Sequence, residues 1–261
     1  MRISCIQMDM LPGMVDHNFA RAEALIRRAA AKEHSDMVVL PETWSTGFRP
    51  SDMVEEADEE GRRTRETFSA LAKELHINIL CGSIAERREG DLYNTAYVFD
   101  REGRVAARYD KTHLFSYGGE DRHVTPGSSI CTFTLEGRKC ALIICYDIRF
   151  PELTRACALQ GAEILFAVAQ WPRERIAHLD TLSRARAIEN QMFVALCNSV
   201  GTVKHITCGG HSAVIDPWGQ YLALAGEGEE IITAEADFSQ VGAIRSTIDV
   251  FRDRRPQLYR T

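Results

Sequence analysis

Short apolar runs alternate with amphipathic helical patterns in the first third of the chain. Runs of apolar residues predict strands at residues 2–8, 37–40 and 77–83. Apolar residues at helical spacing predict helices at residues 18–33 and 60–76. The resulting β-α-β-α-β order is typical of a sheet covered by helices.

The remainder of the chain continues this mixture after a hairpin pattern. The predicted strands lie at residues 93–99, 104–109, 130–135, 140–144, 163–169 and 193–197, and the predicted helices at 152–160 and 175–191. From residue 212 onward, short strands and tight turns indicate a second sheet stacked face to face on another. The chain contains no Ser/Gly linker and no internal repeat, so we expect a single α/β domain over residues 1–261.

Composition narrows the possible partners. The chain has 31 Lys and Arg against 37 Asp and Glu, a net charge of −6 that argues against nucleic-acid or membrane-surface binding. Its apolar runs are shorter than a membrane span, and its first residues lack the apolar block of a signal peptide. The 8 cysteines are scattered without a CxxC pair, which is typical of reduced thiols, and we expect a cytoplasmic protein.

One cysteine stands where a nucleophile would be expected. The apolar run 140–144 ends at Cys145, turn-forming residues follow, and a helix is predicted to begin near Pro151. Open α/β sheets bind ligands at the carboxyl ends of their strands, and the first turn of a helix offers unpaired N–H groups. An isolated cysteine is nevertheless most often a small core residue. Cys145 is therefore a candidate nucleophile that needs support from other residues.

Other polar residues supply that support because they also follow predicted strands. Glu42, Lys111 and Asn198 each stand at a strand end, and parallel strands bring such ends to one rim. A thiol at neutral pH needs a neighbouring base or cation, and Glu42 could be the base. An ammonium such as Lys111 stabilises both a thiolate and the oxyanion formed when a carbonyl is attacked. The backbone N–H of Tyr146 would complete that oxyanion site.

Two other kinds of site remain possible at this point. A Cys-His pair would have to use His113 or His123, and neither lies in a supporting motif. A metal site could form from His205, Cys208 and His211, but no fourth ligand lies at a familiar spacing. The GxSxG, GxGxxG, P-loop and HExxH motifs do not occur. We expect neither a metal nor an organic cofactor.

Five sequence blocks resemble the nitrilase superfamily of carbon–nitrogen hydrolases from one end of the chain to the other. They are VVLPETWSTGF, YDKTHLF, ICYDIRFPEL, ARAIENQMFVALCNSVG and GHSAVIDPWG. The resemblance implies a catalytic triad of Glu42, Lys111 and Cys145. It also implies a second catalytic glutamate, Glu120, which lies seven residues before Gly127. The family fold is a four-layer α-β-β-α sandwich, usually paired into a homodimer.

Within this superfamily the chain is most similar to the omega-amidases. The similarity lies in RFPEL, in the segment from Trp171 to Arg175, and in the tail VFRDRRPQLY. It implies hydrolysis, through a thioester, of the distal amide of dicarboxylate monoamides such as 2-oxoglutaramate and succinamate. Such a substrate needs a cation in the pocket, for which Arg175 is the candidate, with Trp171 as a wall. Arg149 is expected to brace the turn through Asp147 or Glu152.

Several alternatives stay open within this interpretation. N-carbamoyl compounds, aliphatic amides and nitriles are possible substrates, and a non-catalytic scaffold is a more distant possibility. Two segments depart from the family pattern near the substrate side, His178-Leu179 and residues 202–209. We also expect the tail, which carries Arg252, Arg254 and Arg255, to reach across a dimer.

Overall fold

Two stacked β-sheets form the centre of the molecule, as the computed structural model shows for residues 1–259. The first sheet contains, in spatial order, β15 (Glu230–Glu235), β1 (Arg2–Gln7), β2 (Met37–Val39), β4 (Asn78–Arg88), β5 (Asp91–Phe99) and β6 (Val105–Asp110), with β3 (Asp58–Glu59) beside β4. The second contains β14 (Tyr221–Leu224), β13 (Ala213–Ile215), β10 (Phe193–Asn198), β9 (Ile164–Ala169), β8 (Arg138–Ile144) and β7 (Cys131–Leu135). A separate small hairpin pairs β11 (Thr202–Val203) with β12 (Ile206–Thr207).

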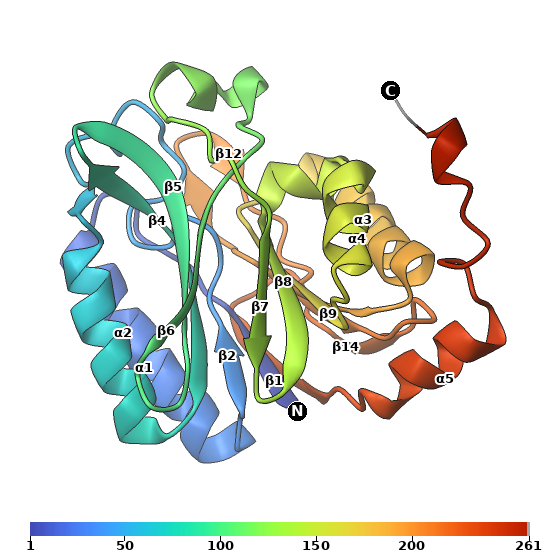
Figure 1. Ribbon diagram of the computed structural model, residues 1–261. Coiled ribbons are helices and arrows are strands. Elements are labelled where there is room, and N and C mark those ends of the chain that lie inside the picture. The colour runs from blue at the N-terminus through green and yellow to red at the C-terminus, as the bar shows by residue number, and fades with distance from the viewer. Residues whose placement is uncertain (260–261) are drawn as a thin grey trace.

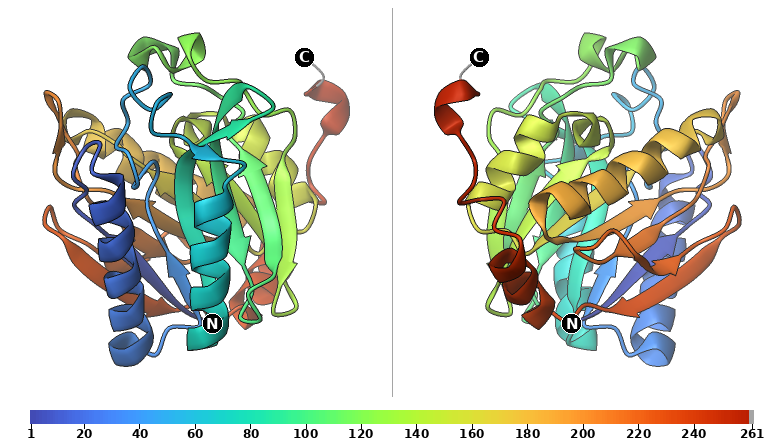
Figure 2. Two further views of the ribbon diagram at one scale, coloured as in Figure 1. Left: turned by 90° about the vertical axis from the view of Figure 1, so that its left-hand side faces the viewer. Right: turned by 90° about the vertical axis from the view of Figure 1, so that its right-hand side faces the viewer.

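Each sheet has three parallel strands at its centre, joined by helices. In the first sheet, β1, β2 and β4 are parallel, and in the second, β8, β9 and β10 are parallel. The connecting helices are α1 (Val15–Glu33), α2 (Arg62–Leu75), α3 (Pro151–Leu159) and α4 (Ile176–Asn190). Helices α1 and α2 cover one outer face, whereas α3 and α4 cover the other (Figures 1 and 2). The predicted β-α-β order is therefore confirmed in both halves.

Alternation of side chains along the strands builds three apolar layers. In β8, Leu142 and Ile144 point between the sheets, whereas Ala141 and Ile143 pack under α3 and α4. On the far side, Phe68 of α2 packs among residues from the outer face of the first sheet. Burying each large apolar side chain contributes roughly 1.5–3 kcal/mol. The expected four-layer α-β-β-α sandwich is confirmed.

The C-terminal part differs from its prediction in two respects. Strand β15 does not join the second sheet but returns to the first, where it pairs antiparallel with β1. This pairing covers an edge of β1 that would otherwise expose unpaired backbone groups. A fifth helix, α5 (Ser239–Thr247), follows, and its buried residues Val241 and Ile244 explain why a weak helical pattern still folds there.

The strand ends that matter for function meet at one edge of the sandwich. Four residues follow β2, β6, β8 and β9 and line a common pocket; they are Glu42, Lys111, Cys145 and Gln170. Two of these strands belong to each sheet, so the site lies across the junction of both. None of the helices within residues 1–259 is long and apolar enough to cross a membrane.

Candidate active site

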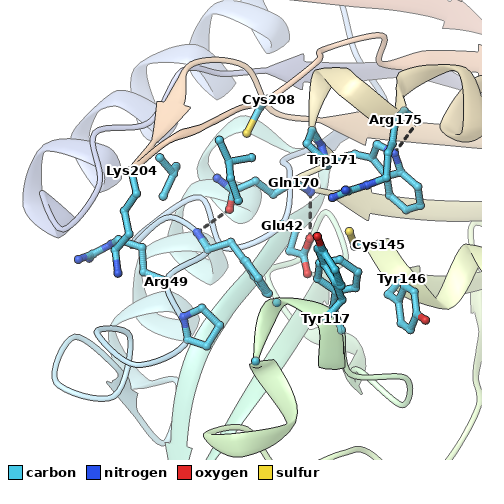
Figure 3. Close-up of a pocket in the computed structure, with 18 of the residues that line it drawn as sticks. Glu42, Arg49, Tyr117, Cys145, Tyr146, Gln170, Trp171, Arg175, Lys204 and Cys208 are labelled. Atoms are coloured by element: carbon cyan, nitrogen blue, oxygen red, sulfur yellow. Dashed lines mark hydrogen bonds between the residues drawn. The ribbon is translucent and has the colours of Figure 1, made fainter.

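Cys145 stands on a sharp turn directly after β8. It begins the short 3-10 helix Cys145–Arg149, and its φ of 47° lies in the left-handed region. A residue other than glycine adopts this conformation at a cost, and such strain is concentrated at functional sites. The turn places Cys145 on the wall of a pocket of about 600 Å³ (Figure 3).

Glu42 is fixed by an unusually close approach of two strands. Gly82 of β4 lies against the backbone of Pro41, and a Cβ atom at this position would come within 2.0 Å of the Pro41 carbonyl oxygen. Glycine is therefore required at position 82, which sets the path of the chain into Glu42. The Glu42 carboxylate is 1% exposed, and its Oε2 accepts a hydrogen bond from the Gln170 N–H at 2.9 Å.

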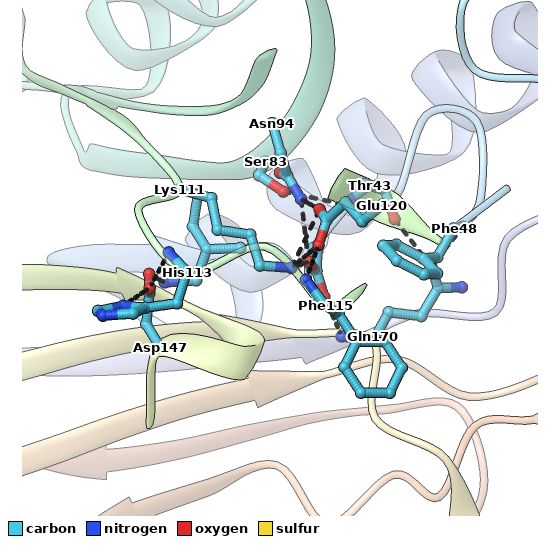
Figure 4. A network of polar contacts seen from close by, with 12 residues as sticks. Thr43, Phe48, Ser83, Asn94, Lys111, His113, Phe115, Glu120, Asp147 and Gln170 are labelled. Carbon is cyan, nitrogen blue, oxygen red and sulfur yellow. Dashed lines mark hydrogen bonds and ion pairs between the residues drawn. The ribbon is translucent and has the colours of Figure 1, made fainter. Parts of the chain in front are cut away.

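Lys111 joins two buried carboxylates (Figure 4). Its Nζ lies 2.8 Å from Glu42 Oε1, and 3.1 and 2.9 Å from the two oxygens of Glu120. All three side chains are at most 1% exposed. Burial alone would lower the pKa of Lys111, but the charges of Glu120 and Glu42 raise that pKa well above its ordinary value. Lys111 is therefore a cation at neutral pH.

The thiol of Cys145 is protonated at rest. Burial raises its pKa, the Glu42 carboxylate raises it further, and Lys111 lowers it only in part, which leaves the pKa well above the ordinary value. A standing thiolate is therefore not available at neutral pH. A nucleophilic role for this thiol would need an adjacent base to take its proton, and Glu42 lies next to it.

Asp147 ties the cysteine turn to the segment that carries Lys111. Its buried carboxylate accepts hydrogen bonds from the Ile144 N–H at 3.0 Å, the His113 N–H at 3.0 Å and the Tyr109 hydroxyl at 2.8 Å. The His113 ring also bonds to this carboxylate, through Nδ1 at 2.8 Å. His113 is thus engaged by Asp147, and the carboxylate beside Cys145 belongs to Glu42.

One part of the pocket wall carries cationic side chains. Trp171 and Arg175 line it, and the Trp171 indole N–H donates to the Arg175 carbonyl oxygen at 2.8 Å. Arg149 also lines it, with its guanidinium 4.7 Å from the Trp171 ring and 3.3 Å from His178 Nδ1. The expectation that Arg149 braces Asp147 or Glu152 is wrong, because the guanidinium faces the pocket. Within residues 1–259, neither Arg149 nor Arg175 forms an ion pair.

The chain is similar in sequence to known proteins over nearly its whole length. Residues 2–246 match the model of the carbon–nitrogen hydrolase family. The chain belongs to this family. It is 42% identical to the 2-oxoglutaramate amidase of Bacillus subtilis over 98% of both chains. It is 34% identical to the omega-amidase NIT2 of Homo sapiens, over 99% of this chain and 96% of that protein.

A solved structure supports the same assignment of this carbon–nitrogen hydrolase. XC1258 from Xanthomonas campestris, described as a CN-hydrolase superfamily protein with an arsenic adduct in its active site, aligns over 97% of both chains. The TM-score is 0.91 and the sequence identity is 30%. The resemblance to the nitrilase superfamily and its fold is therefore confirmed.

The segment 202–209, which departs from the family pattern, lies over the pocket of this hydrolase. The β11–β12 hairpin contributes pocket-lining residues, among them Lys204, which pairs with Asp52 at 3.2 Å. Cys208 is buried, which raises the pKa of its thiol, and His211 bonds to Asp180 instead. The described part of the chain contains no group of three side chains that could hold a metal ion.

Sequence reasoning missed residues that act through distant neighbours. Asp147 offered a weak signal, since it lies two residues after Cys145 in a turn. Asn94, which bonds to both Glu42 and Glu120, lies within the predicted strand 93–99 and offered none. Gln170, whose backbone N–H and side chain position the Glu42 segment, was not recognised either.

Proposed function

We propose that this carbon–nitrogen hydrolase cleaves the distal amide of short dicarboxylate monoamides, 2-oxoglutaramate and succinamate, to the dicarboxylate and ammonia. The observation that carries the proposal is a pocket lined both by Cys145 and by two arginines, Arg149 and Arg175, that have no ion-pair partner among residues 1–259. A substrate with a carboxylate at the end opposite its amide would supply that partner. The names of the relatives, 2-oxoglutaramate amidase and omega-amidase, agree with this chemistry.

The first half of the reaction forms a thioester. Glu42 takes the proton of Cys145 while the sulfur attacks the amide carbon, and a C–S bond forms. The carbonyl oxygen gains negative charge, which Lys111 and the Tyr146 N–H stabilise. The C–N bond then breaks as Glu42 returns its proton to the nitrogen. Ammonia leaves, and the acyl group stays on the sulfur.

The second half releases the acid. Glu42 takes a proton from water as the water oxygen attacks the thioester carbon, and Lys111 again stabilises the oxyanion. The C–S bond breaks, the dicarboxylate leaves, and the thiol regains its proton from Glu42. Glu120 acts by orienting Lys111, a role supported by its two contacts with Nζ, and it orients the substrate only through Lys111, because Glu120 itself does not line the pocket. Each step uses side chains or backbone groups of this chain, and no step calls for a metal or an organic cofactor.

Ammonia release from succinamate, 2-oxoglutaramate and uncharged butyramide tests the substrate proposal. We expect the wild type to hydrolyse the two amides that carry a carboxylate faster than it hydrolyses uncharged butyramide. Arg149→Met and Arg175→Met should each raise KM for them by about 10- to 100-fold, because a charge-assisted hydrogen bond is lost. Arg173→Met is the matched control, since Arg173 belongs to the same 3-10 helix as Arg175 but pairs with Glu227.

Other outcomes of the same assay would redirect the proposal. If butyramide, an N-carbamoyl amino acid or a nitrile is hydrolysed faster than succinamate and 2-oxoglutaramate, the proposed substrate class is wrong and another activity of the superfamily is favoured. Turnover of none of these compounds would favour a non-catalytic scaffold.

We further propose a single-domain, cytoplasmic homodimer. The family match over residues 2–246 supports one domain, and the 8 free thiols suit a reducing compartment. The tail runs past α3 and α4 at the side of the sandwich (Figure 1) and exposes Ile248, Leu258 and Tyr259 by 50% or more. A second copy would cover such apolar side chains. Light scattering after size exclusion should give a dimer mass at micromolar concentration, and a monomer mass would contradict the proposal.

A further inference from the structure

Asn94 forms a second bridge between the two buried glutamates (Figure 4). Its Nδ2 donates to Glu42 Oε1 and to Glu120 Oε1, both at 3.0 Å. These two oxygen atoms also accept hydrogen bonds from Lys111. Asn94 and Lys111 are neighbours across β5 and β6, since the Lys111 N–H donates to the Asn94 carbonyl oxygen at 2.9 Å. A neutral donor thus duplicates two of the three contacts of the cation.

The donor capacity of Lys111 explains why a duplicate is needed. An ammonium has three N–H bonds, and Lys111 has three close contacts, one to Glu42 and two to Glu120. A hydrogen bond to a developing oxyanion therefore has to replace or weaken one of them. When Lys111 turns toward the oxyanion, Asn94 still donates to both carboxylates. The positions of Glu42 and Glu120 are then maintained while the cation changes partners.

The oxygen atom of the Asn94 amide indicates that the two glutamates impose the orientation of this side chain. Asn94 is fully buried, and its Oδ1 has no hydrogen-bond donor among residues 1–259. An unsatisfied buried carbonyl oxygen destabilises the folded protein. Rotating the amide would place Oδ1 against two carboxylates, which is less favourable still. Asn94 is also absent from the pocket wall, so it acts from behind Glu42 and not on the substrate.

We propose that Asn94 is a positioning residue that holds Glu42 and Glu120 in place while Lys111 moves onto the oxyanion. The inference rests on the proposed function for its catalytic consequence. Its effect on thiol activation needs no substrate, because that effect depends only on the proton transfer from Cys145 to Glu42.

Asn94→Leu removes both donors at nearly constant size. We expect kcat for succinamate to fall about 10- to 100-fold with KM almost unchanged, since a hydrogen bond to a charged group is lost and no substrate contact is touched. Because Glu42 loses a donor that holds it in place, alkylation of Cys145 by iodoacetamide should slow about 10-fold, and the slowing should persist across the pH profile. Intact mass would measure that alkylation.

Asn78→Leu is the matched control. Asn78 is also fully buried in the first sheet, donates twice through Nδ2, to the Asp36 carbonyl oxygen and to Glu136, and has an unpartnered Oδ1. Its loss should lower stability but leave kcat and the alkylation profile unchanged. Asn94→Ala, which removes both donors and places no new polar atom against the two carboxylates, replaces Asn94→Leu if that variant does not fold.

The two readouts separate the inference from the substrate proposal. If the wild type does not hydrolyse succinamate but Asn94→Leu still changes the alkylation of Cys145 as predicted, the proposed substrate is wrong and the role of Asn94 is supported. Unchanged kcat and an unchanged alkylation profile in a folded Asn94 variant overturn that role. Equal changes in the Asn78 variant would overturn it as well, because they would reflect loss of packing.

Discussion

Cys145→Ala should remove ammonia release from succinamate while leaving the protein folded. The loss should reach about 10⁶-fold, the scale observed when the nucleophile of a triad enzyme is removed, because the proposed acyl intermediate forms on the Cys145 sulfur. Stability should change little, since the thiol lies at a pocket wall and alanine meets the same backbone strain as cysteine. Ammonia release and thermal unfolding, measured on the same preparations, test both expectations.

A second cysteine provides the control for this experiment. Cys208 also lines the pocket, on the hairpin side, but no catalytic step uses it. Cys208→Ala should therefore keep most of the turnover. Substantial activity in Cys145→Ala, or a comparable loss in Cys208→Ala, would show that the nucleophile is not Cys145.

The positions of Glu42, Lys111 and Cys145 could be predicted because each follows a strand. The carboxyl ends of parallel strands share an edge, so residues far apart in sequence were expected on one rim. The structure brings them together there, with Lys111 2.8 Å from Glu42. The assignment of Glu120 rested on the family resemblance, since an irregular loop carries no periodicity that could fix its position.

Other features could not be predicted because they depend on partners from distant elements. In the sequence, Asn94 is an ordinary residue of a predicted strand. Its role depends on Glu42, which follows β2, and on Glu120, in the loop after β6, because both carboxylates contact its amide. Arg149 faces the pocket because Asp147 is already satisfied by Tyr109, His113 and Ile144. Strand β15 pairs with β1, the strand at the other end of the chain, and local patterns do not encode such a pairing.

The charge balance of the site has a consequence for stability at high pH. Burial opposes the Lys111 cation, yet the neighbouring carboxylates keep its pKa in the folded protein well above the ordinary value of about 10.4. The stability that Lys111 contributes is thus fully present below about pH 10.4 and is lost as the pH rises through its folded-state pKa. Around neutral pH, the ion cluster should therefore stay intact.

Lys111→Ala should damage both catalysis and folding. Loss of an oxyanion donor costs about 2.7–4 kcal/mol, so kcat should fall about 100- to 1,000-fold. The variant also leaves Glu42 and Glu120 buried without their cation, and breaking a buried ion pair costs about 3–5 kcal/mol of stability. Because these effects overlap, loss of activity in Lys111→Ala is informative only for a fraction shown to be folded.

A second substitution separates the two effects. Combining Lys111→Ala with Glu120→Gln removes one of the uncompensated charges, so the free energy of unfolding should recover in part, while kcat should stay low because the oxyanion donor is still missing. Denaturant unfolding and single-turnover ammonia release measure the two quantities independently. Recovery of kcat along with stability would assign the damage in Lys111→Ala to the unpaired charge. The oxyanion role would then pass to backbone N–H groups such as that of Tyr146.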